Sequence, residues 1–253
     1  MSFSRNYQSV PSWAGSQQAS LDAGLRTYML RIYNWMSSGL VLTALVAWGI
    51  ANTSMRSLFF RTDGYAVHPT GLGMIAMIAP LGFVLVMSFG VNRLSRQAVQ
   101  TLFWLFCGVM GASMANIFMI YTGVSVARVF LVTAGTFAAT SLWGYATKTD
   151  LTRMGSFLMM GLFGLIIAGL VNMFMHSPAL YFATSLIGVF LFIGLTAFDT
   201  QRIKATYLQF AQYEGPDEAA KRSVYDALAL YLNFINLFQF LLQFMGVRNS
   251  GNN

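Results

Sequence analysis

Long apolar runs, separated by short polar stretches, make up most of this chain. Seven of them reach the roughly 20 residues that an α-helix needs to cross a bilayer. Between Arg153 and Asp199 there is no Asp, Glu, Lys or Arg, a length sufficient for two spans with a break at His176-Ser177-Pro178. The pattern predicts an all-α membrane protein with seven transmembrane helices, at about residues 32–51, 71–91, 98–121, 126–146, 154–175, 179–198 and 225–245.

Composition supports a membrane class. Charged residues make up 9% of the chain and hydrophobic residues 56%, whereas a soluble domain carries about a quarter charged residues. The net charge of +7 comes from basic residues scattered between apolar spans, with no basic cluster interleaved with aromatics. We therefore expect the lipid bilayer as partner and no nucleic acid. The single Cys107 excludes an intrachain disulfide.

The chain divides into a polar tail at 1–30, expected to be mobile and cytoplasmic, a seven-helix membrane domain at 31–246 and a short C-terminal tail at 247–253. Lys and Arg favour the cytoplasmic side of membrane proteins, so their bias predicts a cytoplasmic N-terminus and an external C-terminus. A last helix that dips in and returns would leave both ends cytoplasmic. With the N-terminus inside, the inner segments hold Arg5, Arg26, Arg31, Arg93, Arg96, Lys148, Arg153, Arg202, Lys204, Lys221 and Arg222, and the outer ones Arg56, Arg61, Arg128 and Arg248.

The last apolar run carries polar side chains at helical spacing. Asp226, Asn233, Asn236 and Gln243 fall on one side of a helix, and Phe and Leu cover the others. A polar stripe inside a bilayer faces protein or water rather than lipid, so we expect this helix at the centre of the bundle. The alternative is that the amides are interhelical hydrogen-bond groups, each worth roughly 0.6 kcal/mol. Asp226 is interpreted as a residue near the helix start.

Asp199 lies at the end of a charge-free run, with Arg202 and Lys204 just behind it. Charge near hydrocarbon is expensive, so such a residue is a functional-site hypothesis; the alternative is that it marks where the helix leaves the bilayer. Asp199 and Arg202 are neighbours on a helix because they are three residues apart. Arg93 and Arg96, in the loop between the second and third spans, are expected at the same end. These three arginines are candidate latches for Asp199.

The sequence contains no catalytic constellation. There is no Gly-x-Ser-x-Gly, His-Glu-x-x-His or Walker loop. His68 and His176 have no metal-ligand partner three or four residues away, so we expect neither a zinc or haem site nor any other cofactor. An intramembrane aspartyl protease would need a second Asp facing Asp199. We therefore expect a protein that is not an enzyme.

Two motifs resemble a known family. Near the end of the sixth span, residues 197–204 read AFDTQRIK, and in the last span residues 230–238 read LYLNFINLF. Both resemble signatures of the Bax inhibitor-1 (TMBIM) family, whose bacterial members are of the YccA and YbhL types. The resemblance covers nearly the whole chain after the tail. It implies seven helices with the last one central, and location in a bacterial inner membrane.

The resemblance also implies a function. Similar bacterial proteins act as pH-sensitive calcium leaks in which two Asp residues, one on the sixth and one on the last helix, share a proton and close the pore. Asp199 matches the first position, but Asn233 occupies the second. Asn233 can donate a hydrogen bond to ionised Asp199, and a single carboxylate should bind calcium more weakly than a pair. We expect a calcium leak with altered pH gating, with Asp199, Asn233 and Asn236 along the ion pathway.

Other functions stay open. A membrane interaction protein could restrain a membrane protease or modulate a stress response, a role associated with some bacterial family members. A proton-coupled transporter is a further alternative, but no inverted repeat supports it. Calcium is expected as the permeant ion; Asp199 is the one candidate position for it, and no metal site is firmly assigned. If Asp199 is not the switch, Asp226 is the next candidate.

Overall fold

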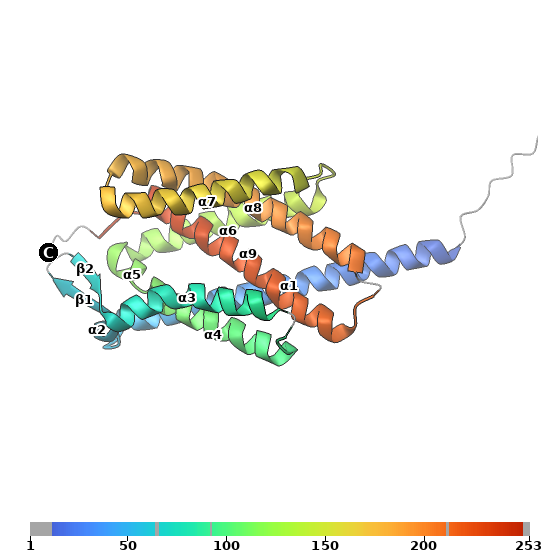
Figure 1. Cartoon of the computed structure of the whole chain (residues 1–253), viewed down its shortest axis with the longest axis horizontal. Helices are drawn as coiled ribbons and strands as arrows, with labels where there is room; N and C mark the ends of the chain where they lie inside the picture. The colour runs from blue at the N-terminus through green and yellow to red at the C-terminus, as the bar shows by residue number, and fades with distance from the viewer. Residues whose placement is uncertain (1–11, 64–65, 92, 211–212, 250–253) are drawn as a thin grey trace, which may run out of the picture.

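The computed structural model describes residues 12–63, 66–91, 93–210 and 213–249, and it is dominated by helices (Figure 1). Seven helical segments have the length and apolar composition to cross a membrane, which confirms the predicted number of spans. In chain order the elements are α1 (Ser12–Asn52), α2 (Arg56–Phe59), β1 (Phe60–Asp63), β2 (Ala66–Pro69), α3 (Gly71–Gly90), α4 (Arg96–Met114), α5 (Ile117–Ile120), α6 (Gly123–Ala146), α7 (Thr152–Met175), α8 (Pro178–Phe210) and α9 (Pro216–Met245).

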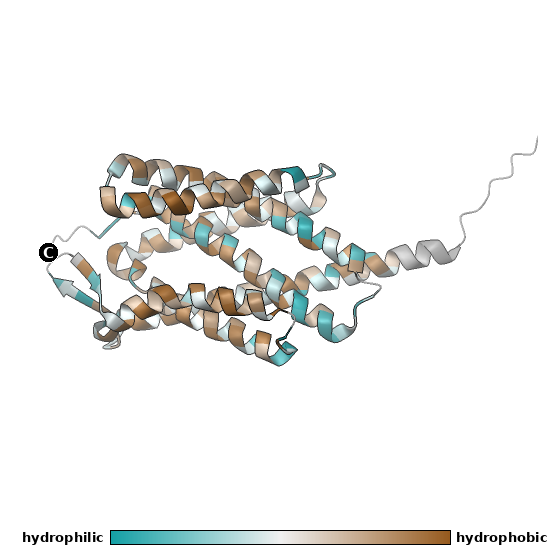
Figure 2. Cartoon of the chain, viewed as in Figure 1, coloured by the Kyte–Doolittle hydropathy of each residue, from teal (hydrophilic) through white to brown (hydrophobic). Residues whose placement is uncertain are grey.

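Helix α9 packs against α1, α4, α6 and α8 and crosses the bundle obliquely between them (Figure 1). In the most apolar 18-residue stretch of α9, 56% of the residues are buried, whereas the share is 33% or less in each of the other spans. The opposite case is α7, which packs on α8 and has only 6% of the corresponding stretch buried. Helix α7 is hydrophobic along most of its length (Figure 2), and most of its large apolar side chains are exposed, as expected for side chains solvated by lipid.

The bundle has two chemically different ends. We call one the basic end; here α3 meets α4, α6 meets α7 and α8 meets α9, and hydrophilic residues gather on it (Figure 2). The other, the hairpin end, carries the β1–β2 hairpin, α5 and residues 246–249 (Figure 1).

Three helices are longer than a single membrane crossing requires. Helix α1 has 41 residues, α8 has 33 and α9 has 30. A crossing of the hydrocarbon core needs only about 20 residues at the usual helical rise. The excess of all three helices lies at the basic end, where they extend past the other spans (Figure 1).

The N-terminal region differs from the mobile tail that we predicted over residues 1–30. Helix α1 begins at Ser12 and not close to the predicted start of the first span at residue 32. Leu25, Tyr28 and Met29 are buried, and Ile32 continues the same face. Their spacing of three and four residues forms an apolar stripe on an otherwise polar helix, which packs against the extended parts of α8 and α9. Residues 1–11 of that tail, and 250–253 of the C-terminal one, lie outside the described residues.

Two helix boundaries and one connection also differ from the prediction. The third span is not one helix to Tyr121, because α4 ends at Met114 and the short α5 follows. Helix α8 continues past Phe198 to Phe210. The hairpin of β1 and β2, which pairs Phe60 with Pro69, was not predicted.

Helix α9 begins with a proline and an acidic first turn. Gly215 is the N-cap, Pro216 opens the helix, and Asp217 and Glu218 lie in its first turn. Acidic residues at this position interact favourably with the helix dipole. Asp226 is therefore not at the helix start, as we interpreted it, but more than two turns inside the helix.

Candidate ion-pair site between α8 and α9

Contacts with α6 and the α6–α7 connection fix the orientation of α8 near Asp199. Gly144 of α6 touches the backbone of Ala197, so a side chain at position 144 would clash with α8. One turn further on, Gln201 donates to the Thr149 carbonyl at 2.8 Å and accepts from the Leu151 amide at 2.8 Å. These contacts hold α8 against α6, which leaves Asp199 facing α9.

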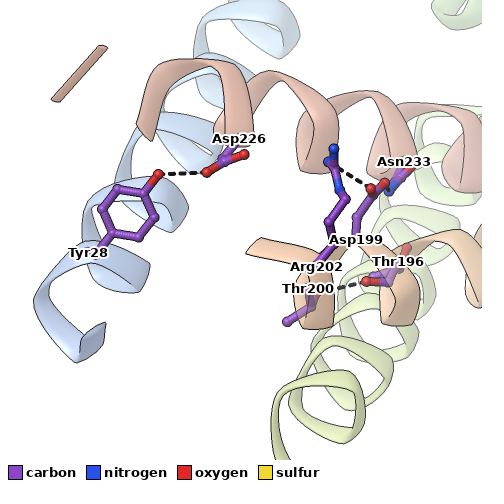
Figure 3. Close-up of polar contacts among 7 residues, drawn as sticks. All are labelled: Tyr28, Thr196, Asp199, Thr200, Arg202, Asp226 and Asn233. Atoms are coloured by element: carbon purple, nitrogen blue, oxygen red, sulfur yellow. Dashed lines mark hydrogen bonds and ion pairs between the residues drawn. The ribbon is translucent and has the colours of Figure 1, made fainter. Parts of the chain in front are cut away.

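Asp199 carries an ion pair with Arg202, one turn along the same helix (Figure 3). Arg202 Nη2 lies 2.8 Å from Asp199 Oδ1. The Asp199 side chain is 15% exposed and that of Arg202 47%. The carboxylate is thus enclosed while the guanidinium remains accessible from the basic end. Arg202 therefore has room to change its side-chain rotamer and separate from Asp199.

Asn233 of α9 completes the coordination of Asp199. Its Nδ2 donates to Asp199 Oδ2 at 2.7 Å, and its side chain is buried (Figure 3). Each carboxylate oxygen therefore has one partner, a guanidinium on one side and an amide on the other. Both partners are hydrogen-bond donors, which match the acceptor oxygens of the carboxylate. The structure brings together the three residues Asp199, Arg202 and Asn233 as the sequence predicted.

Asp226 forms a second acidic position, two turns before Asn233 on α9. The Tyr28 hydroxyl of α1 donates to Asp226 Oδ2 at 2.6 Å (Figure 3). Arg202 and Arg222 lie within electrostatic range of Asp226, but neither forms an ion pair with it among the described residues. Tyr28 was missed in the sequence because it lies in the segment interpreted as a tail.

The other latch candidates do not reach Asp199. Arg96 Nη1 pairs with Asp217 Oδ1 at 3.0 Å, on the exposed surface of the basic end. Arg93 lies in the exposed connection after α3, and no ion pair joins it to Asp199 within the described parts of the chain. Of the three arginines, only Arg202 contacts the carboxylate.

A chain of hydroxyl groups lies on another face of α8. The Thr200 hydroxyl is 2.9 Å from that of Ser141 on α6, and Ser141 in turn contacts the Tyr33 hydroxyl of α1. Thr200 also donates to the Thr196 carbonyl at 2.8 Å (Figure 3). These groups link α1, α6 and α8 beside the ion pair. No periodic pattern in the sequence indicates them, because they come from three separate helices.

The remaining polar side chains of α9 lie toward the hairpin end. Asn236 Nδ2 donates to the Leu232 carbonyl of its own helix at 2.8 Å, and no hydrogen bond joins it to Asp199 in the described structure. Gln239 and Gln243 line a cavity of about 370 Å³, and the Ser185 hydroxyl donates to Gln243 Oε1 at 3.1 Å. The polar stripe thus runs from a charged cluster at the basic end to an amide-lined cavity at the hairpin end.

Asp199 supplies one carboxylate to any cation that reaches it. Calcium takes six to eight oxygen ligands, so most of its ligands here would be water and backbone oxygens. Within the described residues, no group of three or more His, Cys, Asp and Glu side chains is arranged to hold a metal ion.

Comparison with known proteins gives a consistent assignment. Residues 25–250 match the family described as "Inhibitor of apoptosis-promoting Bax1". Inner membrane protein YbhL of Escherichia coli K12 is 43% identical over 227 residues, covering 89% of this chain and 94% of YbhL. "Uncharacterized protein RP147" of Rickettsia prowazekii is 46% identical over 234 residues, covering 92% and 94%. A protein of Caulobacter vibrioides is 44% identical over 249 residues, covering 96% and 97%.

The match begins at Leu25, a buried side chain of α1, and ends beyond α9, so it includes every membrane-spanning helix. It also includes both motifs that form the Asp199 site. Because the similarity extends over the whole bundle rather than over one helix pair, the chain belongs to the Bax inhibitor-1 family of integral membrane proteins.

Proposed function

We propose that this protein is a cation leak channel, with calcium as the permeant ion and Asp199 at the constriction. The observation that carries the proposal is the enclosed Asp199 carboxylate, held between Arg202 and Asn233 at 2.8 and 2.7 Å. An ionisable group on a membrane-spanning helix is expensive and is a functional-site hypothesis by default, and ion pathways are among the sites that such groups mark. The family membership supports the same assignment.

The path of the ion follows α9. Its polar side chains begin beside the amide-lined cavity of the hairpin end, at Gln243 and Gln239, and continue through Asn236 to Asn233 and Asp199. Polar side chains at membrane depth line water-filled spaces or pair within the protein. In this proposal the cavity admits the hydrated ion, and the Arg202–Asp199 pair closes the path at the basic end.

Asn233 changes the gating expected of a two-carboxylate site. Two neighbouring carboxylates cannot both ionise at low free-energy cost, so such a pair takes up a proton near neutral pH. An Asp–Asn pair lacks this repulsion, and Asn233 donates to Asp199 in its ionised form. The native leak is therefore governed by movement of Arg202 and depends only weakly on pH between about 6 and 8, where a single Asp stays ionised.

Calcium flux into liposomes that contain only the purified protein tests the proposal. We expect flux in the native protein and a several-fold reduction in Asp199→Asn, which removes the one carboxylate at the constriction. Asp150→Asn is the matched control, because Asp150 is exposed in the α6–α7 connection and caps α7 through the Thr152 amide at 2.9 Å. Flux that survives in Asp199→Asn contradicts the assignment of the site. Absence of flux in the native protein would favour the interaction protein that restrains a membrane protease or another membrane complex.

We further infer that the protein lies in the bacterial inner membrane with its basic end in the cytoplasm. The Lys and Arg bias supports this orientation, and the E. coli relative is named an inner membrane protein. A reporter fused to the N-terminus should read cytoplasmic, and one fused after the last residue should read external. A cytoplasmic reading at both termini would contradict a full crossing by α9.

A further inference from the structure

The cavity at the hairpin end has the features of a binding site for a small solute. It has a volume of about 370 Å³ and lies among α3, α4, α5, α8 and α9. Pockets of roughly 300–1,000 Å³ accommodate small-molecule ligands. The polar side chains in its lining belong to Ser113, Asn116, Tyr121, Tyr181, Gln239, Gln243 and Arg248.

Arg248 is the one charged side chain in this lining, and its backbone is fixed. Residue 248 forms an antiparallel bridge with Tyr121. On either side of it, the Thr122 amide donates to the Val247 carbonyl at 3.1 Å and the Asn249 amide donates to the Ile120 carbonyl at 2.9 Å. These hydrogen bonds fix the segment after α9 against the α5–α6 connection. Arg248 is therefore held at the cavity, and this segment does not need to become ordered when a ligand binds.

The guanidinium of Arg248 lies among aromatic hydroxyls rather than carboxylates. Its central carbon is 6.0 Å from the centroid of the Tyr121 ring. The Tyr121 hydroxyl is the main cause that raises the pKa of Arg248, and the Tyr181 hydroxyl adds to it. No ion pair of Arg248 occurs within the described chain. A permanent positive charge with five N–H donors therefore has no anionic partner among the residues that the structure describes.

The cavity lining offers further hydrogen-bonding groups. The side chains of Gln239 and Asn116 make no hydrogen bond to other described residues and remain available to a ligand. Ile117, Ile120 and Leu242 supply apolar surface to the same lining. The cavity thus combines a single cation, neutral donors and an apolar wall.

From this geometry we propose that the hairpin-end cavity binds a small organic monocarboxylate with a compact apolar body. A guanidinium matches a carboxylate through two parallel hydrogen bonds. The apolar wall accommodates the body of the ligand, and the amide side chains orient it. The single positive charge of Arg248 matches one carboxylate, whereas a doubly charged phosphate would be left half-neutralised. This site does not require that the protein conducts ions.

Benzoate is a suitable probe, and benzamide, which is neutral and nearly isosteric, is its control. Isothermal titration calorimetry is carried out with the full-length protein in nanodiscs, with empty nanodiscs as the blank for partitioning. We expect benzoate to bind at least about tenfold more tightly than benzamide, because a charge-assisted hydrogen bond is stronger than a neutral one. Equal affinities, or no benzoate binding, would overturn the proposal.

Two variants separate the site from general electrostatics. Arg248→Gln should abolish the preference for benzoate over benzamide, and a thermal melt verifies that the variant is folded. Arg61→Gln removes a positive charge from the same end of the bundle, on the exposed strand β1 and outside the cavity lining, and should leave the preference unchanged. Retention of the preference in Arg248→Gln, or its equal loss in Arg61→Gln, would rule out recognition by Arg248.

Discussion

From Pro216 to Asn233, α9 carries charged and polar side chains that meet partners from other elements, and we call this part the paired half. From Phe234 to Met245, which we call the cavity half, the polar side chains are neutral amides, and Gln239 and Gln243 line a cavity. In the first half, Asp217 pairs with Arg96 and Asp226 with Tyr28. Asn233 ends this half at the Asp199 carboxylate. In the second half, Gln239 has no hydrogen-bonding partner among the described residues.

This difference shows how one helix can hold a closed and an accessible region in series. Paired charges are held by their partners and must be separated before an ion can pass. Unpaired amides in a polar cavity can instead be solvated by water or by a ligand. In the proposed leak, an ion or solute therefore reaches the middle of α9 from the hairpin end and meets its barrier at Asp199. The following predictions test this contrast, starting with the largest expected effect.

Asn233→Asp should convert the paired half into a pH-operated gate. The variant places a second carboxylate beside Asp199 Oδ2, where the Asn233 amide now donates at 2.7 Å. As pH falls, the two carboxylates take up a shared proton and the site closes. Calcium flux in liposomes should fall by about tenfold from pH 8 to pH 6, since a change of about 1.4 kcal/mol corresponds to a factor of ten.

The control for this gate is Asn236→Asp, which adds the same charge one turn away, at a side chain that donates a hydrogen bond to the Leu232 carbonyl of its own helix. It should not reproduce the steep pH dependence. A native protein that already closes steeply between pH 8 and 6, with Asn233→Asp unchanged from it, would show that the Asp199 pair is not the gate.

Arg202→Gln should weaken closure of the paired half. Loss of the guanidinium removes the cation 2.8 Å from Asp199 and leaves the carboxylate free to interact with a passing ion. The Arg202 side chain is 47% exposed, so its contribution is screened to about 1 kcal/mol and the flux should rise about fivefold. Lys204→Gln is the control, because Lys204 Nζ donates to the Tyr145 carbonyl and does not contact Asp199. An unchanged or lower flux in Arg202→Gln would refute the latch.

Tyr28→Phe should weaken the packing of α1 against α9 at the basic end. It removes the hydroxyl that donates to Asp226 at 2.6 Å and leaves that carboxylate dependent on Arg202 and Arg222. We expect the free energy of unfolding to fall by about 0.8 kcal/mol, measured by denaturation in detergent. Tyr207→Phe, whose ring packs on Tyr28 at 4.9 Å, changes the neighbouring hydroxyl and should have a smaller effect. Equal effects of the two variants would mean that Asp226 does not depend on the Tyr28 hydroxyl.

Ser185→Ala tests the cavity half and should have the smallest effect. Its hydroxyl donates to Gln243 Oε1 at 3.1 Å and also to the Tyr181 carbonyl of its own helix. A neutral interhelical hydrogen bond in a membrane protein contributes about 0.6 kcal/mol, so the loss of stability should not exceed that. Ser38→Ala, which removes only bonds within α1, is the control. If Ser185→Ala lowered the free energy of unfolding more than Tyr28→Phe does, the cavity half rather than the paired half would contain the stronger interhelical hydrogen bond.

Much of the architecture follows from the sequence because a bilayer imposes a simple rule on it. A crossing helix needs about 20 apolar residues, and a backbone in hydrocarbon must satisfy its own hydrogen bonds, so the seven runs specify seven helices. The polar stripe identifies α9 as different from α7, whose membrane-spanning surface is apolar on nearly all sides. The Asp199–Arg202 contact also follows from the sequence, since residues three apart on a helix are neighbours.

Asn233 as the partner of Asp199 was predicted from the resemblance of two motifs, not from spacing, because no periodicity relates residues on different helices. The same limitation explains the features that were missed. Tyr28 and Asp226 are hydrogen-bonded although 198 positions separate them in the chain. Arg248 pairs with Tyr121 although helices α6 to α9 lie between them in the sequence. Local spacing determines which side chains share a helix face, but only the packing of helices decides which faces meet. That packing creates the Asn233–Asp199 and Tyr28–Asp226 hydrogen bonds and the cavity at the hairpin end.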